Sequence, residues 1–203
     1  MKILKNIVLG LIVLVVLLAA IGLVALPRQS AVTRSLVINA PAEVIFDQVN
    51  DLKKNEAWSP WKDPTMVITY GAVTEGQGAT SSWTSKDMGK GTMTIEETAP
   101  SSAIKIGLDF GAMGKAKALW SFVPEGDGVK VTEIMASDAG MNPAKRWMSL
   151  MSDKMVGPYF EKGLAALKTV SETRAAQLKT EQAATMQAAV TEEAAPAPAV
   201  KTK

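Results

Sequence analysis

The sequence contains no cysteine and no histidine. Without cysteine, the chain forms no disulfide bond and has no thiolate nucleophile. A zinc site built from Cys and His is excluded, and so is a Ser-His-Asp relay. Acid–base catalysis near neutral pH would need a carboxylate or a lysine with a strongly shifted pKa. We therefore expect neither a metal ion nor a cofactor.

The chain also lacks an excess of charge beyond its first 26 residues. Lys2 and Lys5 are the basic residues of that segment, so 20 of the 22 basic residues remain, against 20 acidic residues. A neutral domain has little of the long-range field that attracts proteins to phosphate backbones. Nucleic acid is therefore not an expected partner.

Residues 7–26 contain no charged and no polar side chain, reading IVLGLIVLVVLLAAIGLVAL. As a helix this segment spans about 30 Å, the thickness of a bilayer core. The alternative is a cleaved signal peptide, but its apolar part runs only about 7–15 residues before a small-x-small site. Ala20-Ile21-Gly22 fits such a site poorly. We predict an uncleaved transmembrane helix that follows a short cytoplasmic segment, residues 1–6.

The charges that flank this segment indicate its orientation. Lys2, Lys5 and the amino terminus precede it, whereas Arg28 and Arg34 follow it. The positive-inside rule favours a cytoplasmic amino terminus. The predicted location is the bacterial inner membrane, crossed once, with the soluble domain in the periplasm or outside the cell.

The rest of the chain divides into a linker, one domain and a tail. Residues 27–31 are a predicted linker, and residues 32–170 have the pattern of one α+β domain. Residues 171–203 are rich in Ala, Gln and Glu, contain few bulky apolar side chains and are predicted to be a disordered tail.

Within the domain, a β-branched run at 32–38 predicts a first strand, and Pro41 then opens a helix. A second helical turn is expected from Asp51 to Ala57. Six further strands follow, separated by glycine and proline turns that favour an antiparallel meander: 66–70, 79–85, 90–97, 102–110, 116–123 and 128–138. Apolar residues at helical spacing predict a long helix over 143–170, with a kink at Gly157-Pro158.

Three segments resemble parts of one known family. They are Ile38–Phe46 (INAPAEVIF), Asp51-Leu52 with Trp58–Trp61 (WSPW), and Gly157–Lys168 (GPYFEKGLAALK). The first is similar to the opening strand-to-helix segment of the START-like superfamily, also grouped as SRPBCC proteins, which includes the polyketide cyclase/dehydrase type. The second resembles the end of the second helix in membrane-anchored bacterial members, and the third resembles the closing helix.

The resemblance covers about residues 32–170 and implies a helix-grip fold. In that fold a seven-stranded antiparallel sheet wraps around a long C-terminal helix, with a cavity between them. It implies no single activity, because members bind lipids, sterols or hormones or cyclise polyketides. The residues expected to line the cavity are Tyr70, Trp83, Met93, Ile104, Ile106, Leu108, Trp120, Phe122, Met151 and Met155. The alternative is that these side chains simply fill a core.

Polar groups that could act in such a cavity are few. Glu133 alternates with Val129, Val131 and Met135, so an inward Glu133 would be a buried carboxylate with a raised pKa. It is the candidate catalytic residue, ahead of Glu96 and Asp109, unless it lies at an exposed edge or in a salt bridge. Trp58 and Trp61 are expected to pin the short helices to the sheet; the alternatives are that they gate the cavity mouth or contact the bilayer interface.

Three functions remain open at this stage. The first is a membrane-tethered domain that binds an apolar small molecule or a lipid without catalysis. The second is an enzyme of the polyketide cyclase/dehydratase kind that uses a buried carboxylate. The third is a non-catalytic envelope scaffold that acts through a protein partner, which the sequence does not identify. We favour binding, because it needs only an apolar lining and a mouth.

Overall fold

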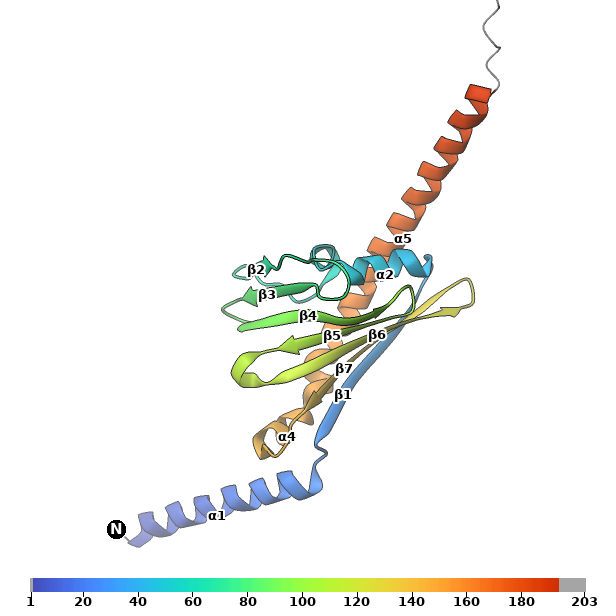
Figure 1. Cartoon of the computed structure of the whole chain (residues 1–203). Helices are drawn as coiled ribbons and strands as arrows, with labels where there is room; N and C mark the ends of the chain where they lie inside the picture. Colours follow the sequence, from blue (N-terminus) through green and yellow to red (C-terminus); the bar gives the residue numbers. More distant parts are fainter. Residues whose placement is uncertain (1, 194–203) are drawn as a thin grey trace, which may run out of the picture.

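Figure 1 shows a curved sheet with a very long helix packed behind it and a second helix projecting from one end. The computed structural model describes residues 2–193. The projecting helix is α1, Lys2–Ala25, and the long helix is α5, Ser152–Glu193. The short helices between them are α2 (Ala42–Asn50), α3 (Asn55–Trp58), α4 (Pro143–Ser149) and a 3-10 turn, Gly111–Met113.

Seven antiparallel strands form the sheet: β1 (Gln29–Ile38), β2 (Val67–Tyr70), β3 (Thr80–Thr84), β4 (Lys90–Ala99), β5 (Ala103–Asp109), β6 (Lys115–Glu125) and β7 (Gly128–Asp138). Their order is β1-β7-β6-β5-β4-β3-β2. From β2 to β7 each strand pairs with its neighbour in sequence, because short turns join them. Gly89 (φ 68°) and Gly126 (φ 60°) provide the positive φ that two of these turns require. The predicted helix-grip α+β fold is confirmed.

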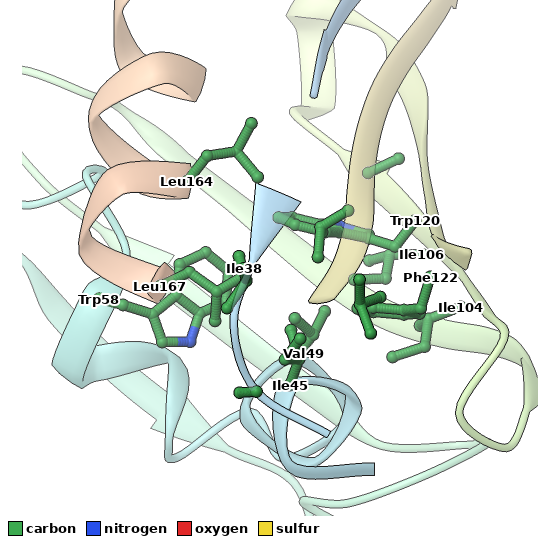
Figure 2. Packing of buried hydrophobic residues seen from close by; sticks show 14 of the residues in the cluster. Ile38, Ile45, Val49, Trp58, Ile104, Ile106, Trp120, Phe122, Leu164 and Leu167 are labelled. Carbon is green, nitrogen blue, oxygen red and sulfur yellow. The ribbon is translucent and has the colours of Figure 1, made fainter. Parts of the chain in front are cut away.

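The core lies between the concave face of the sheet and helices α2, α3 and α5. Figure 2 shows Leu164 and Leu167 of α5 on one side of this core and Trp120 and Phe122 of β6 on the other. Trp58 at the end of α3 packs edge-to-face on Trp120, with ring centroids 5.6 Å apart. The strands place these side chains inward because alternate residues of a strand point to opposite faces.

Two boundaries differ from the sequence-based expectation. β1 begins at Gln29, inside the predicted linker, because β7 extends to Asp138 and pairs with β1 along its whole length. The expected helix over 143–170 is divided into α4 and α5 at Leu150 and Met151, whereas Pro158 lies within α5.

Helix α5 also continues to Glu193, through much of the segment expected to be disordered from residue 171. Ser171 and Ala175 are still buried, so the helix packs on the domain for another turn. Beyond that point Ala, Gln, Glu and Lys are good helix formers, and a helix already nucleated on a core extends at little cost. Residues 194–203 of the predicted tail lie outside the described residues.

Candidate ligand-binding site

Strand register arranges the concave face in rows of side chains that cross the sheet. Leu108, Met93, Ser81 and Tyr70 form one row, since each pairs with the next across β5, β4, β3 and β2. The adjacent row contains Trp83, which pairs with Gly91 on β4 and Ile68 on β2. Except for Ser81, the side chains of these rows are apolar or aromatic.

One end of the concave face is closely packed. Ile104, Ile106, Trp120 and Phe122 are each less than 5% exposed and belong to the buried core cluster. Figure 2 shows them against the α2 side chains Ile45 and Val49. The side chains of these four predicted lining residues therefore already pack against other protein side chains.

The other end of the concave face is more open. Tyr70, Met93 and Leu108 are only partly buried against the core, and Trp83 is partly exposed, with its ring edge-to-face on Phe110 at 5.7 Å. The long helix packs mainly on β1, α2 and α3, and α2 packs on β5 and β6. We call Tyr70, Trp83, Met93 and Leu108 the open end.

Met151 and Met155, which were also expected to line the site, lie apart from this group. They are 57% and 58% exposed, at the junction of α4 and α5. Two open grooves run along exposed α5 surface near Leu178 and along the start of α1. Neither groove lies between α5 and the sheet.

Tyr70 is held at the rim of the open end by the second short helix. Its hydroxyl hydrogen-bonds the Glu56 carboxylate and lies 3.5 Å from the carbonyl oxygen of Leu52. Burial, reinforced by the Glu56 charge, raises the pKa of Tyr70. The phenol is therefore a neutral hydrogen-bonding group at physiological pH.

Glu133 is a buried acid on the concave face, a position that its alternation with Val129 and Val131 leaves open against an exposed edge or a salt bridge. It is 8% exposed, between Arg34 of β1 and Trp120 of β6 in the cross-strand row. Burial raises its pKa to about 8. Within residues 2–193 its carboxyl makes no hydrogen bond or ion pair, because the Arg34 side chain turns toward α5 instead. At neutral pH it is largely protonated and can donate a proton or a hydrogen bond.

Glu96 and Asp109 do not have the raised pKa of Glu133. Glu96 pairs with Lys117 at 3.0 Å and Asp109 pairs with Lys115 at 2.9 Å, and in each case the lysine lowers the pKa of the carboxyl. Both therefore remain ionised at neutral pH. Within residues 2–193, no group of three or more His, Cys, Asp or Glu side chains is arranged so that it could hold a metal ion.

An ion-pair network between β1 and α5 was not predicted. Arg34 donates to Glu161 and to Asp153, both at 2.8 Å, across the surface of α5. Gly157 lies between the two acids, and a β-carbon there would overlap the guanidinium. The spacing Asp-x3-Gly-x3-Glu, which places all three residues on one helix face, is the signal that could have revealed it.

The two tryptophans of the WSPW turn pin the short helices to the fold. The Trp58 indole donates to the carbonyl of Gln48 at 3.0 Å, within the core. Trp61 stacks on Tyr159 of α5, with ring centroids 4.4 Å apart and planes inclined by 6°. Between them, Pro60 lies against Gly163, where a β-carbon would be 3.0 Å from the proline ring. Trp58 therefore joins the short helices to the sheet, as expected, whereas Trp61 joins the turn to α5.

Comparison with known families gives one match that spans the domain. A family model described as polyketide cyclase / dehydrase and lipid transport matches residues 29–172. These residues run from the first residue of β1 into the middle of α5. No curated protein matches the chain.

Solved structures share the fold at low sequence identity. A Staphylococcus aureus protein of unknown function is 11% identical, with a TM-score of 0.57 over 72% of this chain and 95% of that one. A Nitrosomonas europaea protein is 9% identical, with a TM-score of 0.53 over 71% and 96%. A Mycobacterium smegmatis protein is 14% identical, with a TM-score of 0.50 over 71% and 92%. At these identities the similarity concerns the fold alone.

Proposed function

Because the chain belongs to the polyketide cyclase/dehydrase and lipid transport family, we propose that it binds an apolar small molecule or a lipid at the open end of its concave face. The partly exposed row of Tyr70, Met93 and Leu108, with Trp83 beside it, is the observation that carries this proposal. When a ligand covers apolar side chains that are accessible in a concave surface, their removal from water stabilises the complex. The Tyr70 hydroxyl at the rim would orient a polar group of the ligand.

The proposal includes a membrane anchor. α1 is long and apolar enough to cross a bilayer, a length and composition that a signal sequence can share. Lys2 and Lys5 precede it, which supports a cytoplasmic amino terminus and a domain on the periplasmic side. A reporter enzyme that is active only outside the cytoplasm, fused after Lys203, would be active in this orientation and inactive in the opposite one.

Native mass spectrometry of the full chain, purified from its host membrane, tests the binding proposal. We expect a stoichiometric apolar adduct, which solvent extraction would assign to a chemical class. Met93→Lys places a charge in the open end and should weaken retention of the adduct by roughly tenfold or more. Thr92→Lys places the same charge on the exposed outer face and should leave the adduct in place.

The two variants also define the result that would contradict binding. If the wild-type chain carries no adduct and takes up none of a panel of fluorescent lipids, the open end is not a binding site. Equal loss of the adduct from both lysine variants, with both still folded, would place the ligand elsewhere on the molecule.

Glu133 supports a second candidate function, an enzyme of the cyclase/dehydratase kind. A carboxyl that is protonated at neutral pH is the general acid such a reaction needs. Glu133→Gln would then abolish turnover of the extracted ligand and leave its binding intact. Glu97→Gln, at an exposed position of β4, is the matched control and should change neither.

A further inference from the structure

Helix α4 packs directly on the C-terminal half of α1. The Trp147 indole donates a hydrogen bond to the carbonyl oxygen of Leu18 at 3.0 Å. Gly22 is the buried residue of α1 at this contact, and a β-carbon there would lie 2.9 Å from the indole nitrogen and 3.2 Å from Pro143. The glycine therefore permits the close approach of the two helices.

Arg146 of α4 makes hydrogen bonds to the C-terminal end of α1. Its buried guanidinium donates to the carbonyls of Leu23 (2.6 Å) and Leu26 (3.1 Å), and also to the carbonyl of Gly140 (2.8 Å). The last carbonyls of a helix lack intrahelical partners, and a cation is favoured at this end of the helix dipole. The joint between α1 and the domain is thus held by polar bonds as well as by packing.

The position of the Trp147–Leu18 hydrogen bond along α1 shows how deep α4 would lie in a bilayer that α1 spans. Leu18 lies eight residues before Leu26, where the apolar run ends, so its carbonyl is about 12 Å inside that end at the helical rise. A bilayer core about 30 Å thick is matched by the whole run, residues 7–26. Any bilayer that encloses this run therefore also reaches the Trp147 side chain.

The side chains that α4 and its neighbours expose suit that environment. Five large apolar residues between positions 141 and 155 are 55% to 77% exposed: Met141, Met148, Leu150, Met151 and Met155. Lys145 and Lys154 lie among them and provide positive charge for anionic headgroups. Apolar side chains combined with lysines and a tryptophan are typical of a segment that lies in the membrane interface.

The open end of the concave face lies on the same side of the domain. A β-carbon on Gly114, at the turn between β5 and β6, would be 2.9 Å from the Lys145 ammonium. Phe110, at the other side of that turn, contacts Trp83 of the open end. Figure 1 shows α4 close to the end of the sheet at which α1 is attached.

We propose that residues 141–155, the interfacial segment, lie at the boundary between the headgroup layer and the hydrocarbon core of the bilayer that α1 spans, with their exposed methionines in lipid. The inference rests on the membrane anchor of the proposed function and adds to it a fixed orientation. The open end then faces the membrane surface, so its ligand would enter from the bilayer.

Spin-label depth measurements test this placement in the full chain. Because the sequence has no cysteine, a single Cys introduced at Met148 or Met151 takes a nitroxide at that position alone. The protein is reconstituted into vesicles of phosphatidylcholine and phosphatidylglycerol. Val13→Cys in α1 is the lipid reference, and Met186→Cys, at an exposed position on the outer part of α5, is the water reference.

We expect the labels at 148 and 151 to collide with oxygen in preference to a water-soluble nickel chelate, as the label at 13 does. The label at 186 should show the reverse preference. If 13 reports lipid while 148 and 151 report water, the anchor holds and the interfacial segment is rejected. If 13 also reports water, the anchor itself is rejected, and the interfacial segment with it.

Discussion

Glu133 makes the stability of the domain depend on pH in a specific window. Its pKa in the folded state is about 8, against an ordinary value of 4.5. Between these values the folded chain holds a proton that the unfolded chain has released, so stability falls as pH rises. The slope is roughly 1.4 kcal/mol per pH unit, and the loss is complete above about pH 8.

We predict that the unfolding free energy in detergent falls by up to roughly 4 kcal/mol between about pH 5 and about pH 9, and that Glu133→Gln removes most of this fall. Urea titrations at several pH values measure it. Arg34, its cross-strand neighbour on β1, stays ionised throughout. The carboxyls with lowered pKa, such as Asp153, titrate below this window. A Glu133→Gln chain with an unchanged slope would show that another group is responsible.

On the scale of elements, the stabilising contacts of α5 end well before the helix does. Leu164 and Leu167 are 2% and 0% exposed, and Ala175 is the last buried residue of the helix whose exposure the structure describes. From Lys179 to Ala189 the described side chains are exposed. The outer part of α5 therefore adds length without adding to the core.

We predict that a chain ending at Leu178 keeps the melting temperature of the full chain. A chain ending at Ala166 loses Leu167 and the turns that follow, so it should lose several kcal/mol or fail to fold. Thermal unfolding followed by circular dichroism measures both. Loss of stability at the first truncation would mean that the outer helix packs on the domain. Loss of function without loss of stability would favour the scaffold hypothesis.

Sequence patterns predict the strands because alternation and glycine turns are local signals. The same local signals explain the misplaced boundaries. Gln29 to Ala31 have no apolar alternation, yet they pair with β7, and the residues after Ser171 are helical although they contain few bulky apolar side chains. Alternation places Glu133 on the same face of β7 as Val129 and Val131, but the structure was needed to show that this face is inward. By contrast, nothing near Arg146 in sequence indicates that it bonds to Leu23, because that contact joins residues far apart in the chain.

On the scale of the whole molecule, α1 and the domain are joined by polar contacts at the segment that connects them. Arg28 lies three residues after the end of α1. Its side chain pairs with Asp138 at 2.8 Å, and its carbonyl accepts a hydrogen bond from the backbone N–H of Ala139. Together with the Arg146 bonds, these contacts hold the segment that leads from α1 into β1. A held segment resists proteolysis, because cleavage requires local unfolding of the backbone around the scissile bond.

We predict that trypsin cleaves the reconstituted protein slowly after Arg28, and that Arg146→Gln speeds this cleavage by roughly 10- to 100-fold. That range follows from losing hydrogen bonds of a charged donor worth about 1.5–3 kcal/mol. Arg174→Gln, which removes an exposed ion pair with Glu181 on α5, is the control and should leave the rate unchanged. Mass spectrometry of the fragment that begins at Gln29 measures the rate. Equally fast cleavage of the wild-type chain would mean that the joint is open and that the open end has no fixed orientation toward the bilayer.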